Sequence, residues 1–269
     1  MQTQSNVPTT QKSAPPVTYT PPKGETVLKS DLVIQKVLLQ QGLSKFVSDR
    51  KAQAGDMVRS GSAEKLGDDK KPVSFIPLTF QNLWMISENQ NGDGKKFEFR
   101  RYEPRTAANE SEPWEYIENG TKWKRTKVMN LFALLPSDID AQEAELAKDP
   151  EDINVDKVLL PVVIPFRNTS FKAGKDVATL FAKAESISLR VGRTIPAFGT
   201  TMKLSCTQEK NDKGSFFVYK VETAGATDAK YKETAKSWYN SLAQMDVKID
   251  ESDLEDPIET GSTVGQSQF

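Results

Sequence analysis

The chain has 269 residues, of which 37% are hydrophobic and 27% charged, and its formal net charge is −1. It contains no histidine and one cysteine, Cys206, which excludes Ser-His-Asp and Cys-His catalytic arrangements, HExxH metal sites, internal disulfides and thiolate-rich zinc sites. We therefore predict no enzyme, no cofactor, no metal site and a reducing, cytoplasmic location. No apolar run is long enough to cross a bilayer, so no membrane association is expected.

The N-terminal region is predicted to consist of two segments that precede the main domain. Residues 1–28 are rich in Pro and Thr and lack the apolar centre of a secretory signal, so we predict a disordered arm. In residues 29–72, apolar residues recur near helical spacing, and Gly55 offers a stop. This pattern predicts a helical segment and a linker, with Gly42 as a weak point inside the helix.

Residues 73–245 change to short β-type runs with turn signals between them. Strands are predicted in "VSFIPLTFQNLWMI", "KKFEFRRYEP", "VMNLFALL", "VLLPVVIPF", "TMKLSCTQE" and "SFFVYKVETAG", with hairpin turns at "NQNGDGKK", Asn119-Gly120 and "KNDKG". Helices are predicted in "SFKAGKDVATLFAKAESIS" and "AKYKETAKSWYNSLAQM", and a loop or short helix in "SDIDAQEAELAKDPEDINVDK". The fold class expected is mainly β (α+β), an OB-like antiparallel barrel with helical insertions and disordered termini.

The charges are distributed unevenly along the chain. Between Arg167 and Lys236 the bases exceed the acids by six, whereas residues 246–259 carry seven acids and one base. Such an acidic run repels itself and buries little apolar surface, so residues 246–269 are predicted to be a disordered interaction tail. The tail ends in an aromatic residue, Phe269, which is a candidate anchor for a partner protein.

Aromatic residues alternate with bases in "KKFEFRRY", "TKWKRTK", "SFKAGK" and "KGSFFVYK". Single-stranded nucleic acid binds such surfaces because Lys and Arg hold its phosphates while its unpaired bases stack on aromatic rings. In a strand, the alternation places Trp123 and Arg125 on one face, and Lys122 and Lys124 on the other. The residues predicted to line a DNA-binding groove are Lys95, Phe99, Arg101, Tyr102, Tyr116, Trp123, Arg125, Lys172, Lys175 and Tyr219.

The same alternation also occurs in strands with one buried face and no ligand, so each aromatic residue has a core alternative. Cys206 lies between Ser205 and Thr207 in a predicted strand and is expected to be a small structural residue. The aromatic residues in apolar surroundings are assigned to the core: Phe75, Phe80, Trp84, Phe132, Phe166, Phe181 and Phe217.

Three stretches, "IPLTFQNLW", "PVVIPFRNTSFKAGK" and "IPAFGTTMKLSC…KNDKGSFFVYKVETAG", accompany a Pro-rich start and an acidic tail. In these features the chain resembles single-stranded-DNA-binding proteins encoded by bacteriophages. The resemblance implies an OB-type barrel that coats single strands in DNA replication and recombination, in the host cytoplasm. It also implies a tail that recruits replication or recombination proteins and competes with DNA, although the last acid, Glu259, precedes Phe269 by ten residues. The implied partner-binding residues are Asp253, Glu255, Asp256 and Phe269.

Two other functions and a homo-oligomeric state are left open by the sequence. A structural or assembly protein of a virion also fits a Pro/Thr-rich arm and a β-rich body. A carboxylate-metal enzyme such as a nuclease would need acids such as Asp93, Glu98 and Glu103 to converge. Their spacing is that of ordinary surface charges.

Overall fold

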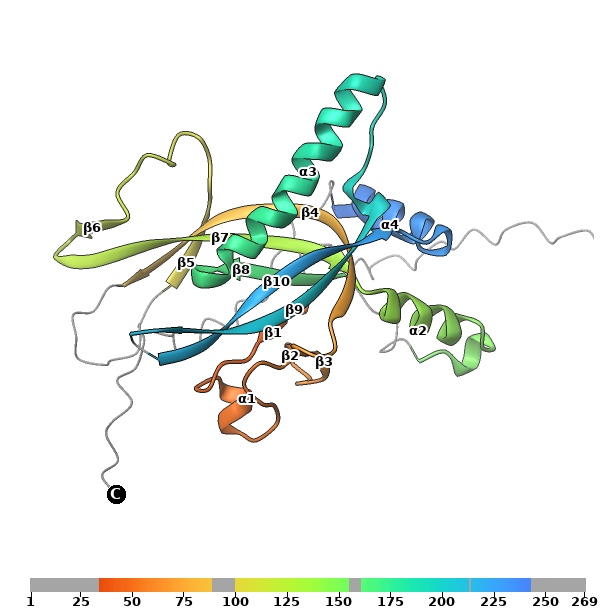
Figure 1. Cartoon of the computed structure of the whole chain (residues 1–269), viewed down its shortest axis with the longest axis horizontal. Coiled ribbons are helices and arrows are strands. Elements are labelled where there is room, and N and C mark those ends of the chain that lie inside the picture. The colour runs from red at the N-terminus through yellow and green to blue at the C-terminus, as the bar shows by residue number, and fades with distance from the viewer. Residues whose placement is uncertain (1–33, 89–99, 155–160, 213, 243–269) are drawn as a thin grey trace, which may run out of the picture.

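The computed structural model describes residues 34–88, 100–154, 161–212 and 214–242 (Figure 1). Most of the ordered elements are strands in antiparallel sheets, so the mainly β fold class is confirmed. The predicted disordered arm at residues 1–28 and the acidic tail at residues 246–269 lie outside the described residues.

A small antiparallel sheet forms where a helix was predicted. Its strands pair in the order β1-β2-β3, and only one turn of helix, α1, follows β1. The helical prediction is therefore wrong for residues 34–72 apart from α1, while residues 29–33 lie outside the described residues. Gly42 lies in a turn that ends the β1 segment, and main-chain pairing with β2 outweighs a weak helical spacing. The bounds are β1 (Val37–Leu39), α1 (Lys45–Ser48), β2 (Met57–Arg59) and β3 (Lys65–Gly67).

The main sheet has seven strands in the order β10-β9-β4-β7-β6, with β5 paired to β4 and β8 paired to β7. The predicted hairpins β6–β7 and β9–β10 are confirmed, and the Asn119-Gly120 turn has the positive φ values that this dipeptide favours. The predicted turn at residues 89–96 lies outside the described residues. The bounds are β4 (Val73–Glu88), β5 (Arg100–Pro104), β6 (Glu115–Glu118), β7 (Thr121–Leu134), β8 (Val162–Arg167), β9 (Thr200–Asn211) and β10 (Gly214–Ala226).

The two faces of the sheet are covered by different helices. Helix α3 contacts β7, β8 and β10, and its Val177 and Phe181 pack with Leu131 and Phe75 in the larger core. Helices α2 and α4 contact β4 on the other face, around Leu78 and Phe132. The bounds are α2 (Pro136–Leu146), α3 (Phe171–Val191) and α4 (Ala229–Leu242), with 3-10 turns at Pro150–Asp152, Asn168–Ser170 and Ala197–Gly199.

Strand β1 lies between β8 and β10. On one side Lys36 forms a parallel bridge with Val163 of β8. On the other side, the Gln41 side-chain amide exchanges two hydrogen bonds of 2.7 Å with the main chain of Phe217 in β10. The described strands thus surround the larger core, but main-chain pairing among them does not join β1 to β10. Closure into an OB-like barrel stays a prediction.

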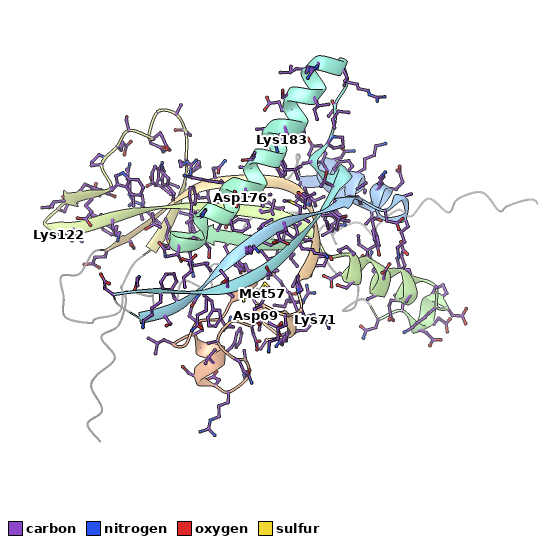
Figure 2. All side chains as sticks on the ribbon, in the orientation of Figure 1. Met57, Asp69, Lys71, Lys122, Asp176 and Lys183 are labelled. Carbon is purple, nitrogen blue, oxygen red and sulfur yellow. The ribbon has the colours of Figure 1, made fainter. Side chains whose placement is uncertain are left out.

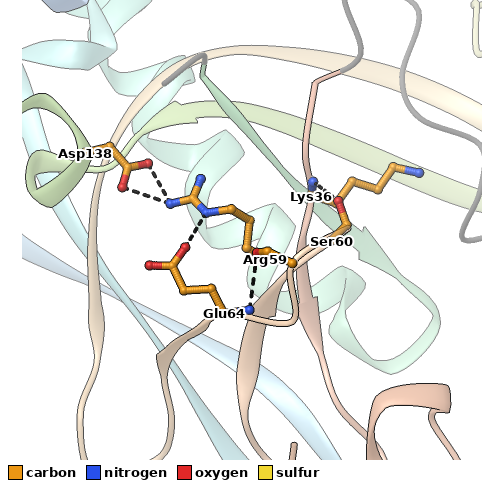
Figure 3. A network of polar contacts seen from close by, with 6 residues as sticks. Lys36, Arg59, Ser60, Glu64 and Asp138 are labelled. Atoms are coloured by element: carbon orange, nitrogen blue, oxygen red, sulfur yellow. Dashed lines mark hydrogen bonds and ion pairs between the residues drawn. The ribbon is translucent and has the colours of Figure 1, made fainter. Parts of the chain in front are cut away.

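A buried ion pair connects the small sheet to α2 (Figure 3). Arg59 Nη2 donates to both carboxylate oxygens of Asp138 at 2.9 Å, and Arg59 Nε donates to Glu64 at 2.9 Å. The Arg59 side chain is only 4% exposed, so these carboxylates compensate a buried charge. The contact fixes β2 beside α2, which covers the core around Leu78 and Phe132.

Candidate nucleic-acid interface

One face of the main sheet continues beyond the helix that covers it. Along β7, Leu131 and Met129 point into the core beneath α3, and the next alternate positions toward the N-terminus are Lys127, Arg125 and Trp123. The alternate residues therefore change from apolar to cationic and aromatic where the helix begins. We call this part, which α3 does not cover, the distal face. It is formed by residues 83–88 of β4, β5, β6 and residues 121–127 of β7, together with Arg105 and Trp114 at the two ends of the β5–β6 loop (residues 105–114).

Four of the residues predicted to bind DNA meet on the distal face. Arg101 Cζ lies 5.8 Å from the centroid of the Trp123 ring, and Arg125 Cζ lies 5.2 Å from that of Tyr116. Tyr116 is the cross-strand partner of Trp123. The predicted placement of Trp123 and Arg125 on one face, with Lys122 and Lys124 on the other, agrees with this register. Figure 2 labels Lys122 at the tip of the β6–β7 hairpin.

A second aromatic cluster on this face was not predicted as part of the site. The Trp84 and Trp114 rings meet edge to face with centroids 6.0 Å apart, and Lys127 Nζ lies 5.4 Å from each. Trp84 is 1% exposed, as its core assignment predicted, whereas Trp114 is 58% exposed. Strand register could have revealed the pair of Trp84 and Lys127, which are direct cross-strand partners.

The same surface extends to the start of α3. Phe171, the first residue of that helix, lies between two cations: Arg105 Cζ at 5.9 Å and Lys175 Nζ at 5.7 Å from the ring centroid. Lys172 is exposed on the same first turn. The predicted lysines of α3 are thereby connected to the distal face through Arg105 and Phe171.

The remaining predicted residues do not join this cluster. The assignment of Tyr219 to the surface is wrong: it is 6% exposed, its hydroxyl donates to Val37 O at 2.8 Å, and burial raises its pKa. Tyr102 lies on the opposite face of β5 and packs against Leu83, Met85 and Val128. Lys95, Phe99 and the four tail residues Asp253, Glu255, Asp256 and Phe269 lie outside the described residues.

Carboxylates accompany the cations of the distal face. Arg101 Nε pairs with Glu103 at 2.9 Å, and Arg105 Nε pairs with Glu110 at 3.2 Å. Glu110 also pairs with Lys127, whose hydrogen bond lowers the pKa of that carboxyl. The positive charges are therefore partly neutralised by acids of the chain itself.

A surface hollow of about 510 Å³ lies elsewhere, between β3, β9 and the segment before β2. Its Lys65 pairs with Asp56 and Asp68 at 2.7 Å each, and contacts with Lys65 lower the pKa of Asp68 to about 2. Cys206 is buried beside it with Sγ 3.0 Å from Gly55 O, a packed position that agrees with its structural prediction. The hollow is also lined by Lys70 and Phe217, but its Lys65 is already neutralised by two acids, so the distal face is the better candidate for binding a polyanion.

The described residues contain no group of three or more His, Cys, Asp or Glu side chains placed to hold a metal ion. No helix among them is long and apolar enough to cross a membrane.

A family model described as Pam3 phage gp34-like protein matches residues 9–248. The chain belongs to this family. No curated protein and no solved structure matches it. Membership in the Pam3 phage gp34-like family supports the predicted bacteriophage origin, while single-stranded-DNA binding and location in the host cytoplasm stay predictions.

Proposed function

We propose that this member of the Pam3 phage gp34-like family binds single-stranded DNA without sequence preference during phage DNA replication or recombination. The observation that supports the proposal is the concentration of six cation–ring contacts on the distal face and the start of α3. These contacts involve bases from β5, β7, α3 and the β5–β6 loop, and rings from β4, β6, β7, α3 and the same loop.

The residue types supply both interactions that a single strand needs. Arg101, Arg125 and Lys127 offer charge to phosphates, and the exposed Trp114 ring offers a surface on which an unpaired base can stack. Stacking on such rings contributes roughly 1–3 kcal/mol per base and occurs with every base type. We therefore expect binding that depends strongly on salt and weakly on sequence.

The proposal assigns the acidic tail a separate role. Asp253, Glu255, Asp256 and Phe269 would recruit replication or recombination proteins, with the acids binding basic surfaces and the ring filling a pocket. This role rests on the resemblance and on the sequence of the tail.

The deciding experiment is a fluorescence-anisotropy titration of labelled oligo-dT with the full chain at two salt concentrations. We expect Trp114→Ala and Lys175→Gln to weaken binding several-fold, because each removes one stacking or phosphate contact. Lys183→Gln is the matched control: it removes the same charge from α3 two turns further along, where the helix projects from the body (Figure 2). Absence of binding by the full chain at low salt would overturn the proposal.

The virion-assembly alternative is tested with the same protein by size exclusion and light scattering. Stable high-order oligomers that form without DNA, together with no dT binding, would favour assembly. A species that binds dT and remains small would favour the DNA-binding proposal.

A further inference from the structure

The β5–β6 loop, residues 105–114, brings acids onto the cations of the distal face. Its start is fixed by Asn109, whose Oδ1 accepts from Thr106 N at 2.8 Å and from Trp84 Nε1 at 3.0 Å. Its end is fixed by Arg125 N, which donates to Trp114 O at 2.7 Å. Between these two attachments lie Glu110 and Glu112, so the loop presents two carboxylates to the sheet.

Each carboxylate pairs with a base that the proposed function assigns to phosphates. Glu110 contacts both Arg105 and Lys127, and Glu112 contacts Arg125. The two acids remain 42% and 44% exposed. Water can solvate each carboxylate once it leaves its base, whereas the bases are only 11–24% exposed and need another anion to compensate their charge. An incoming polyanion supplies that anion and can therefore replace these acids.

The acids leave part of the guanidinium groups without an acceptor. Arg105 Nη1 and Arg125 Nε are buried and have no hydrogen-bond partner in the part of the chain that the structure describes. An arginine has five N–H donors in a fixed fork, which matches the several oxygens of a phosphate. Each glutamate supplies only two oxygens, and those of Glu110 are divided between Arg105 and Lys127.

We propose that Glu110 and Glu112 occupy the positions of two backbone phosphates and are displaced when single-stranded DNA binds. The inference rests on the proposed function and adds its regulation: the β5–β6 loop is a built-in competitor for the distal face. It disfavours weak or isolated anions, whereas a polynucleotide displaces both acids together because its phosphates are linked.

The test compares Glu110→Gln and Glu112→Gln with Glu115→Gln in dT titrations at low salt. All three substitutions remove one negative charge within six residues, but Glu115 lies on β6 opposite Lys124, on the other face. We expect the first two variants to bind about fivefold more tightly than the third, because each removes one acid that competes with phosphate. Glutamine keeps the size of glutamate, and thermal unfolding followed by circular dichroism verifies that each variant is folded.

The outcomes separate the inference from the function on which it rests. Equal affinities of all three variants, with normal binding by the unmodified chain, would overturn the competitor role and leave DNA binding intact. Failure of the unmodified chain and all variants to bind would overturn both. Tighter binding by Glu110→Gln or Glu112→Gln alone would limit the competitor role to that acid and contradict displacement at two phosphate positions.

Discussion

At the scale of single residues, the molecule uses its charges in two different ways. Arg59 and Asp138 are enclosed between the small sheet and α2, where each depends on the other. Asp140, two residues further along the same helix, pairs with Lys230 at 2.8 Å on an exposed surface. The environment of the pair, more than its geometry, determines how much it contributes to stability.

Asp138→Ala is expected to lower the free energy of unfolding by about 3 kcal/mol, because it leaves the buried Arg59 charge without its bidentate partner. Asp140→Ala is the matched control and should have little effect, since both of its partners remain solvated after the change. Urea unfolding of the two variants measures the difference. Equal losses of stability would show that the Arg59 pair is not an important support of the fold.

The alternation of side chains along β10 explains why the surface prediction for Tyr219 is wrong. In "KGSFFVYK" the base Lys220 follows Tyr219 directly, which favours a surface position in the sequence, and Lys220 is indeed exposed. Adjacent residues of a strand point to opposite faces, so a neighbouring base argues against a shared surface. On the sheet, Lys127 lies over the ring of its cross-strand partner Trp84, and Arg125 lies over the diagonally placed ring of Tyr116. Which cation lies over which ring depends on the cross-strand register, and the sequence alone does not show that register.

At the scale of elements, hairpins and amphipathic helices could be predicted because their signals are local. The Asn119-Gly120 turn indicated β6–β7, and the apolar spacing in residues 170–188 indicated α3. The small sheet could not be predicted in this way, because its strands have three residues each and are held by distant partners such as Phe217. The β5–β6 loop was missed as part of the site for the same reason: Glu110 meets Lys127 only after the loop folds back.

The packing of α3 on β8 depends on Gly174. A Cβ added there would lie 2.8 Å from the Cβ of Phe166 and 3.2 Å from the sulfur of Met129. Gly174→Ala should therefore lower stability by about 1–3 kcal/mol through overpacking, even though alanine favours helices. Thermal unfolding measures the loss, with Gly199→Ala as the control because a Cβ there meets nothing within 4 Å. An unchanged midpoint temperature of unfolding for Gly174→Ala would mean that α3 can move away from β8 without loss of stability.

At the scale of the whole molecule, the distal face, the start of α3 and the tail form the proposed binding system. The family match spans residues 9–248 and so includes all of the body, residues 73–245, whereas most of residues 246–269 lie beyond it. DNA contact is proposed for the body and partner recruitment for the tail. Within the body, the stretch from Arg167 to Lys236, which includes the start of α3, has a net charge of +6, whereas residues 246–259 of the tail have −6.

This opposition predicts that a protein ending at Met245 binds oligo-dT more tightly than the full chain. Seven acids on a covalently attached segment compete with phosphates for the same cations at high effective concentration. The gain in affinity on truncation should be largest at low salt. It should shrink as salt screens the attraction of the cations to both the tail and the phosphates, because charges in water act over only about 10 Å at 0.1 M. Anisotropy titrations at two salt concentrations measure it.

The control is a full-length chain in which Asp253, Glu255 and Asp256 are changed to Asn, Gln and Asn, which keeps the tail's length and removes three of its charges. If competition is electrostatic, this chain should fall between the other two in affinity. Equal affinity of all three proteins would restrict the tail to partner recruitment, and a gain from truncation without one from neutralisation would mean that the tail obstructs the site by its bulk.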